Sequence, residues 1–220
     1  MNLTEERLQY LELLSQKFPS PAQVSTEIIN LKAILGLPKG TEHFISDIHG
    51  EYRFFMHILK NASGSVRRKI VQCFTEEDMN NDAVNALATL ICYPEEKLAL
   101  LKEENGRLSV EWYTETLLHL VQVCRKATSK YTRSKVRKAM PRDFAYIIDE
   151  LLNYSEADED DNRTIYVHNI VRNIIEVGSA DAFIIAISEL IQHAVIDKLH
   201  IVGDVFDRGN GAHEVMDALM

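Results

Sequence analysis

The sequence predicts a mostly α-helical chain in which two short strands, far apart along the chain, lie side by side in one sheet. The first strand is predicted where the apolar run 42–45 leads into a glycine turn at 46–52. The second is predicted where the run 198–202 leads into another glycine turn at 203–209. Between them, about 130 residues show helical periodicity and almost no strand signal, so we expect a large helical insertion between two neighbouring strands.

The first 41 residues are predicted to form a helical lead-in. Thr4 is followed by two acids and opens the first helix, because a threonine side chain caps a helix and acids favour its N-terminus. Ser20 and Pro21 supply a cap and a first-turn proline for the second helix, and Gly36 ends it. A short turn then leads into the first strand.

The rest of the chain falls into three predicted parts. Residues 42–62 form the first strand and the helix after it, residues 63–197 form the helical insertion, and residues 198–220 form the second strand and the start of a helix. Breaks at glycine and proline separate the helices predicted within the insertion. These helices are predicted at 66–74, 81–92, 94–104, 109–128, 132–139, 141–153, 162–177 and 180–194.

Composition limits the classes of function. The 220 residues carry a net charge of −9, which argues against general nucleic-acid binding, because that function needs a basic face. No apolar run is long enough to span a bilayer, and the acidic N-terminus lacks the features of a secretory signal. Cys73, Cys92 and Cys124 are odd in number and widely spaced in helical contexts, so we expect reduced thiols. Together these features predict a cytoplasmic protein with neither a nucleic-acid nor a membrane partner.

Two runs of like charge lie inside the predicted insertion. Residues 156–161 are acidic, and we interpret them as a solvated loop, with a cation site as the alternative. The second run is basic, with no acid between Thr116 and Arg142, and residues 67–69 could join it. It is either a solvated helix face or a patch that binds an anionic ligand, such as a phosphosugar or a nucleotide effector. Its members are Arg125, Lys126, Lys130, Arg133, Lys135, Arg137, Lys138 and Arg142.

Acidic and histidine side chains follow both predicted strands. Asp47 and His49 lie two apart at the end of the first strand, and residues i and i+2 of an extended chain point to the same side. A carboxylate and an imidazole at the mouth of a strand can hold one metal ion. Asp204, Asp207 and Arg208 follow the second strand, with glycines where the backbone turns. Because the carboxyl ends of neighbouring strands meet at one edge of a sheet, we expect these side chains to converge.

The two motifs together are specific enough to suggest a family. An Asp-x-His triplet arises often by chance, but a strand that ends in Gly-Asp-x-x-Asp-Arg-Gly is much more specific. The pair resembles the metallophosphoesterase superfamily, which implies an α/β fold, here a partial sandwich. With the segments 61–70 and 93–98, the chain is more closely similar to the class III fructose-1,6-bisphosphatases of bacteria.

That resemblance implies a metal-dependent phosphatase that converts fructose 1,6-bisphosphate to fructose 6-phosphate and phosphate in gluconeogenesis. It implies Mn²⁺ as the cofactor, with Fe or Zn²⁺ as alternatives. Two metal ions would neutralise the phosphoryl charge and activate a water molecule, which phosphate ester hydrolysis requires.

The resemblance also implies a role for each site residue. Asp47 and His49 would ligate the first metal ion, and Asp204 would bridge both ions. Arg208 would hold the substrate phosphate through its planar fork of donors. Asp207 would orient the histidine that acts as general acid.

The chain departs from the family pattern at its end. The family's Gly-Asn-His-Glu motif follows one further strand, and two later histidine ligands follow that, whereas this sequence stops at Met220. The segment 209–214 does not replace the motif, because two extra residues separate its Asn from its His; we expect Asn210 to cap the final helix instead. We therefore expect the 220 residues by themselves to be catalytically inactive.

Other interpretations fit parts of the sequence. Protein Ser/Thr phosphatases and dinucleoside polyphosphate hydrolases share both metal motifs, although the long helical insertion disfavours them. A non-catalytic helical module that binds an effector is the alternative from a different class. The partners we expect are a phosphosugar substrate, an anionic effector at the basic run, and a second copy of the chain in a homo-oligomer.

Overall fold

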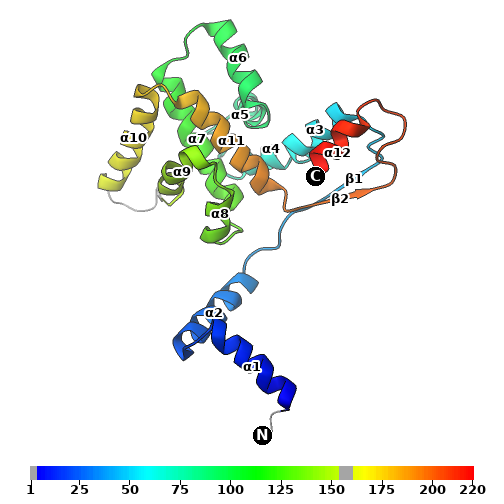
Figure 1. Ribbon diagram of the computed structural model, residues 1–220. Helices are drawn as coiled ribbons and strands as arrows, with labels where there is room; N and C mark the ends of the chain where they lie inside the picture. Colours follow the sequence, from blue (N-terminus) through cyan, green and yellow to red (C-terminus); the bar gives the residue numbers. More distant parts are fainter. Residues whose placement is uncertain (1–3, 154–160) are drawn as a thin grey trace. The chain divides into compact units, whose positions relative to one another are not determined.

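The computed structural model describes residues 4–153 and 161–220. The chain divides into two units, Met1–Lys39 and Gly40–Met220. The second unit contains both strands and most of the described helices (Figure 1). The acidic run predicted to be a solvated loop, 156–161, lies outside the residues whose side chains are described.

The first unit consists of two consecutive helices, α1 (Glu5–Lys17) and α2 (Pro21–Leu35). Ser20 caps α2 as predicted, since its Oγ accepts a hydrogen bond from the backbone N–H of Gln23 at 3.3 Å. Thr4 occupies the N-cap position of α1, but its side chain makes no capping hydrogen bond. Neither helix buries a residue, so this unit has no core of its own among the described residues.

The second unit is built from helices and one pair of strands. Its strands are β1 (Glu42–Ser46) and β2 (Lys198–Val202), and the described residues between them form no other strand. The described residues between the strands are therefore helical, as their periodicity predicts. The helices are α3 (Tyr52–Asn61), α4 (Ser65–Val71), α5 (Asn81–Cys92), α6 (Pro94–Asn105), α7 (Val110–Thr128), α8 (Arg133–Ala139), the 3-10 turn η1 (Arg142–Phe144), α9 (Ala145–Leu152), α10 (Asp161–Glu176), α11 (Ala180–Val195) and α12 (Ala212–Leu219).

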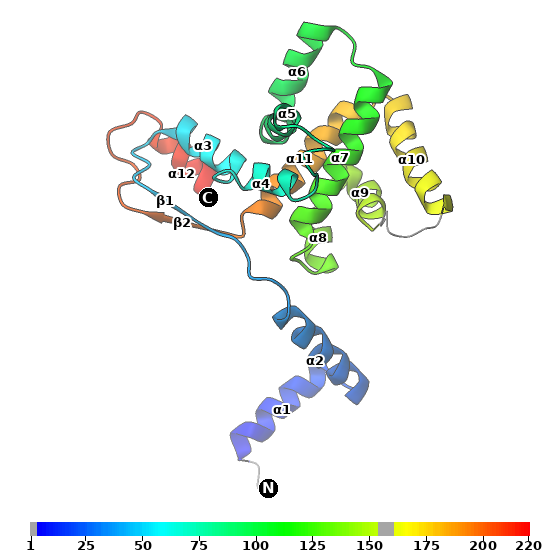
Figure 2. The ribbon, with the colours of Figure 1, turned by 180° about the vertical axis from the view of Figure 1, so that it is seen from behind.

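The two strands are neighbours, as predicted, and they run parallel. Their register pairs Glu42 with Lys198 at one end and Ser46 with Val202 at the other. One face of the sheet packs against α3 and α12, which lie side by side in both views (Figures 1 and 2). The buried residues of this small cluster are Ile45, Ile48, Phe55 and Val215. The sheet therefore holds its helices with only a few apolar side chains.

The main core lies in the helical block. Helices α7 and α11 lie against each other at its centre, and the other helices of the insertion surround them (Figures 1 and 2). Leu117 and Leu120 of α7 and Ile184 and Ile187 of α11 are completely buried there. Burying a side chain of this size contributes about 1.5–3 kcal/mol, so most of the apolar stabilisation comes from the insertion rather than the sheet.

One acidic side chain joins the two segments that lead into the strands. Asp197, just before β2, accepts a hydrogen bond from the backbone N–H of Thr41, just before β1, at 2.7 Å. Its own N–H donates to the Thr41 carbonyl at 3.0 Å. The Lys130 ammonium contacts the same carboxylate and donates to the Thr41 hydroxyl at 3.1 Å. The side chains of Lys130 and Asp197 are only 8% and 10% exposed, so this ion pair, the Asp197 contact, is largely withdrawn from water.

Much of the basic run faces acids of the same chain. Arg133 and Arg137 both donate to the Asp149 carboxylate, at 3.0 and 2.6 Å, and that side chain is only 10% exposed. Lys130 and Lys135 of the run both contact the Asp197 carboxylate, and the Lys135 ammonium lies 3.5 Å from it. The run is thus neither a simple solvated face nor a fully open anion patch, because acids distant in the sequence neutralise much of it.

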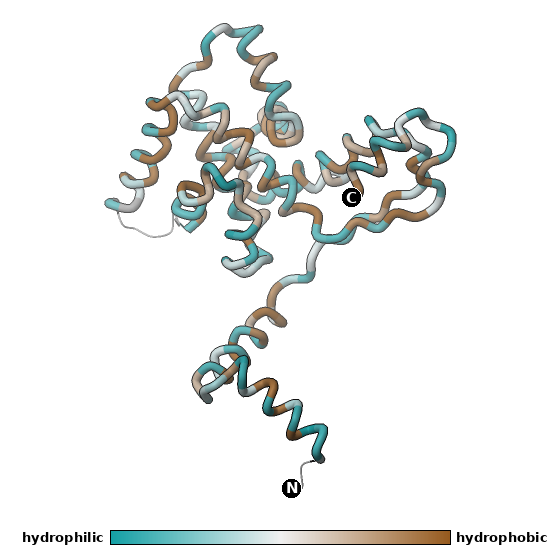
Figure 3. Tube along the Cα trace, in the orientation of Figure 1, coloured by the Kyte–Doolittle hydropathy of each residue, from teal (hydrophilic) through white to brown (hydrophobic). Residues whose placement is uncertain are grey.

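The described helices include none that is both long enough and apolar enough to cross a bilayer. Hydrophobic and hydrophilic positions are interspersed along them (Figure 3). The three cysteines, of which Cys92 and Cys124 are buried and Cys73 is half-buried, are free thiols as expected.

The Asp197 contact yields a stability prediction. Asp197→Asn should lower the free energy of unfolding by about 3 kcal/mol, because it leaves the buried Lys130 ammonium without its counter-charge. Urea denaturation followed by circular dichroism measures this loss. Lys135→Ala is the control: the Lys135 side chain is 62% exposed, so its removal should cost less than about 1 kcal/mol. Equal losses in the two variants would contradict the prediction.

The same contact should weaken in acid. Burial raises the pKa of the Asp197 carboxyl, but hydrogen bonds, the largest from Lys130 and Tyr131, outweigh burial and lower the pKa from 3.8 to about 2. Because the folded pKa lies below the unfolded one, the stabilisation is fully present above about pH 5 and is lost as the pH falls through about 2. The shift corresponds to about 2 kcal/mol. The unfolding free energies of the wild type and Asp197→Asn should converge by that amount between these pH values, and a constant difference would refute this.

Candidate metal centre

Two loops leave the sheet at the carboxyl ends of β1 and β2 and stay hydrogen-bonded beyond the strands. The Asp47 N–H donates to the Val202 carbonyl at 3.1 Å, and the His49 N–H donates to the Asp204 carbonyl at 3.0 Å. The Gly209 N–H donates back to the His49 carbonyl at 2.6 Å. A Cβ at position 209 would lie 2.3 Å from that carbonyl oxygen, so only glycine allows this approach. The loops form one frame that holds the side chains of both motifs.

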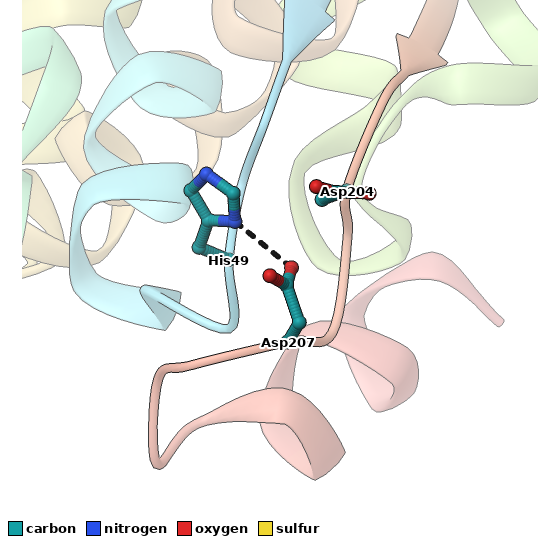
Figure 4. A group of neighbouring side chains, drawn as sticks. All are labelled: His49, Asp204 and Asp207. Atoms are coloured by element: carbon teal, nitrogen blue, oxygen red, sulfur yellow. Dashed lines mark hydrogen bonds and ion pairs between the residues drawn. The ribbon is translucent and has the colours of Figure 1, made fainter.

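One histidine and two aspartates meet on this frame (Figure 4). His49 comes from the first loop, and Asp204 and Asp207 come from the second. Each offers one ligand atom, and these atoms lie within 4.8 Å of one another. The His49 Nδ1 is 2.8 Å from Asp207 Oδ1, with side chains 25% and 45% exposed, so the cluster is open to solvent. The structure thus brings together three of the residues that the sequence singled out.

Asp47 lies at the same edge but is not one of these three. Its Oδ1 accepts a hydrogen bond from the backbone N–H of Asp204 at 3.2 Å. Gly203 permits this contact, since a Cβ there would lie 2.3 Å from the same oxygen. In an extended strand Asp47 and His49 would lie on one side, as the sequence predicts. Both have positive φ, 53° and 52°, so strand alternation does not describe them, and the two side chains have different surroundings.

Arg208 stands beside the cluster. Its Nε donates to Asp207 Oδ2 at 3.1 Å, and its side chain is 72% exposed. The hydrogen bond from His49 lowers the pKa of the Asp207 carboxyl; burial opposes this, and the charges of His49 and Arg208 lower the pKa further. Asp207 is therefore a carboxylate at neutral pH, and it links the imidazole of one loop to the guanidinium of the other.

Backbone strain gathers at this edge of the sheet. Asp47, His49 and Arg208 have φ values of 53°, 52° and 75°. Residues other than glycine adopt this region at a cost of about 1–3 kcal/mol each, and such residues cluster at functional sites. Among the described residues, only Ala62 and Ser63 share the feature elsewhere.

The donor set fits a divalent transition metal ion. One imidazole with carboxylate oxygens suits Mn²⁺, Fe or Zn²⁺ better than an all-oxygen site for Ca²⁺. Nδ1 of His49 faces the Asp207 carboxylate, and this contact favours a proton on Nδ1 (Figure 4). Nothing in the sequence signalled that the partner of Asp207 would be His49.

Two expectations about the second loop need correction or refinement. Asn210 does not cap the last helix, because α12 begins at Ala212 with Gly211 in the N-cap position. His213, on α12, is exposed and is not part of the cluster, in keeping with the rejection of segment 209–214 as a metal motif. Gly211 occupies the N-cap position because the chain turns there against Gly50, whose carbonyl accepts the Gly211 N–H at 3.0 Å.

A parallel strand pair with an imidazole and two carboxylates at its carboxyl edge defines an α/β protein with a candidate metal site. Comparison with known proteins specifies the family. Residues 9–220 match the family described as Firmicute fructose-1,6-bisphosphatase, so the chain belongs to that family.

Curated relatives agree with this assignment. The chain is 57% identical over 213 residues to the "Fructose-1,6-bisphosphatase class 3" of Porphyromonas gingivalis, covering 97% of this chain and 32% of that protein. It is 56% identical over 220 residues to the protein of the same name from Clostridium tetani, covering 100% of this chain and 33% of that protein. The chain thus spans about a third of the length of these relatives. No solved structure matches it.

The contact between Gly203 and Asp47 can be tested by adding one methyl group. Gly203→Ala should lower the free energy of unfolding by about 2 kcal/mol or more, because the Cβ meets the Asp47 carboxylate and φ is +82°. Gly64→Ala is the matched control: φ is +79°, but its Cβ would meet nothing within 4 Å, so it should cost about 1 kcal/mol. Thermal and urea unfolding measure both. Equal losses of unfolding free energy in the two variants would show that the Asp47 carboxylate moves aside without an energetic penalty.

Proposed function

We propose that the protein containing this chain is a metal-dependent phosphatase that hydrolyses fructose 1,6-bisphosphate to fructose 6-phosphate and phosphate. The observation that carries the proposal is the cluster of His49, Asp204 and Asp207 at the carboxyl edge of the sheet. It occurs in a chain whose curated relatives are named fructose-1,6-bisphosphatase class 3. The reaction belongs to gluconeogenesis in the cytoplasm, and the site is of the metallophosphoesterase type.

The candidate cofactor is Mn²⁺, held as a pair of ions. When bound, such a pair neutralises phosphoryl charge and makes a water nucleophilic near neutral pH. His49 and Asp204 would hold the first ion, and the two oxygens of Asp204 allow it to reach the second. Asp47 can contribute as well, since the backbone occupies only its Oδ1 and Oδ2 is left for an ion.

Arg208 binds the phosphate of the substrate. Its Nε is held by Asp207, whereas its two terminal nitrogens have no partner among the described residues. A guanidinium anchored in this way presents two parallel N–H groups to two phosphoryl oxygens. The charge of Arg208 then offsets the charge on the phosphate that the carboxylates would repel.

Asp207 acts as a positioning residue. It holds the His49 ring through Nδ1 and the Arg208 side chain through Nε, so a metal ligand and a substrate-binding group share one anchor. Loss of such an anchor typically lowers metal affinity or activity by about 10–100-fold.

The proposal predicts a large effect of one carboxylate. In the whole protein, Asp204→Ala should slow phosphate release from fructose 1,6-bisphosphate in Mn²⁺ by at least about a thousandfold, because a group that holds the metal ions is lost. The free energy of unfolding should change by less than about 1 kcal/mol, since Asp204 is exposed and packs against no core.

Asp217→Ala is the matched control, because Asp217 is an exposed acid on α12 outside the cluster, and its turnover should equal that of the wild type. Turnover near the wild-type rate in Asp204→Ala would refute the metal centre. A panel containing fructose 1,6-bisphosphate, a phosphoserine peptide and a dinucleoside polyphosphate tests the substrate class. Preference for either of the last two would refute the sugar bisphosphatase assignment while leaving the metal centre intact.

A further inference from the structure

An open depression lies between α4 and α7, on elements that contribute nothing to the metal centre. Its volume is about 740 Å³, which is within the range of small-molecule sites. The segment after α4 supplies Cys73 and Phe74 to its wall, and α7 supplies His119 and Lys126. The wall therefore combines polar groups with two aromatic rings.

Cations gather around this depression without matching acids. Lys126 lines it, and Lys69 of α4 lies one helical turn before Cys73. Neither lysine has an ion pair or a hydrogen bond among the described residues, unlike the lysines at the Asp197 contact. Burial lowers the pKa of the half-buried Lys69 ammonium, and the nearby charges of Lys130 and Lys126 lower it further. Like charges that act on one another in this way favour the binding of an anion nearby.

The other groups at the depression do not neutralise these lysines. Asp78 is the acid in its wall, and its carboxylate already accepts hydrogen bonds from the Thr75 N–H and hydroxyl at 2.9 and 2.7 Å. Phe74 and His119 pack edge to face with ring centroids 4.8 Å apart, and burial lowers the pKa of His119, which keeps its ring neutral. The depression therefore pairs a cationic side with an aromatic side.

We infer that this depression binds the phosphate group of a small phosphorylated ligand, with Lys69 and Lys126 as its cations. Lys126 stands in the wall of the depression and Lys69 on the neighbouring helix, and charge-assisted hydrogen bonds from ammonium groups to a dianion are strong. The dianion also removes the repulsion between the two lysines. The aromatic side accommodates the organic part of the ligand. The inference concerns the helical block alone and does not depend on the proposed catalytic activity.

Cys73 provides a local readout, because it is a half-buried thiol in the wall of the depression, whereas the other two cysteines are buried. In the whole protein, N-ethylmaleimide should alkylate Cys73 about tenfold more slowly when a probe is present at ten times its dissociation constant. Peptide mass spectrometry measures the rate at this one residue. Inorganic phosphate and fructose 6-phosphate are the probes, with chloride at equal ionic strength to control for screening.

Lys126→Glu should abolish the protection and raise the dissociation constant measured by calorimetry at least about tenfold. Lys138→Glu is the matched control, since Lys138 is also an exposed lysine of the basic run but lies outside the depression, and it should retain full protection. Lys126→Gln repeats the test without reversing the charge, which guards against a folding defect. Protection by inorganic phosphate supports the site, and protection by the phosphosugar alone supports a site that also needs the organic part. Unchanged alkylation with both probes, equal protection by chloride, or full protection in Lys126→Glu would overturn the inference.

Discussion

The Asp197 contact determines how the second unit holds together. It ties the residue before β1 to the residue before β2, so it closes the stretch of chain that contains β1, α3 and the helical insertion. Closing a loop of this length costs on the order of 4–5 kcal/mol in chain entropy. Asp197 exchanges two hydrogen bonds with Thr41 and forms a nearly buried ion pair with Lys130, so the segment just after α7 is fastened to the start of both strands.

The position of the site follows from this closure. Once Thr41 and Asp197 are joined, the parallel register of β1 and β2 is set, and the segments after both strands leave the sheet at the same edge. Slipping the register by one residue would turn the apolar side chains of a strand to the opposite face, which the buried Ile45 resists. His49 and Asp204 therefore meet, although most of the chain separates them in sequence, because their loops leave the sheet at the same edge and stay hydrogen-bonded to each other.

The sequence was sufficient for the elements and for the meeting of the two loops, because periodicity and strand-end motifs report those features directly. It was not sufficient for the contacts of single side chains. The positive φ of Asp47 and His49 belongs to a loop conformation that alternation cannot predict, and it places Asp47 against the second loop's backbone. The acids that neutralise the basic run, Asp149 and Asp197, lie elsewhere in the sequence, so no local pattern revealed them.

The division between the large helical core and the small sheet cluster explains how the site can be strained. Asp47, His49 and Arg208 together cost several kcal/mol of backbone strain at about 1–3 kcal/mol each, which is comparable with what the four buried apolar side chains beneath the sheet contribute. The exposed contact between His49 and Asp207 adds little stability, since exposed ion pairs contribute about 0–1 kcal/mol. The contact instead orients the His49 ring relative to the Asp207 carboxylate. The buried helices of the insertion add to the stability of the strands that carry the site, because the Asp197 contact joins the segment after α7 to the start of both strands.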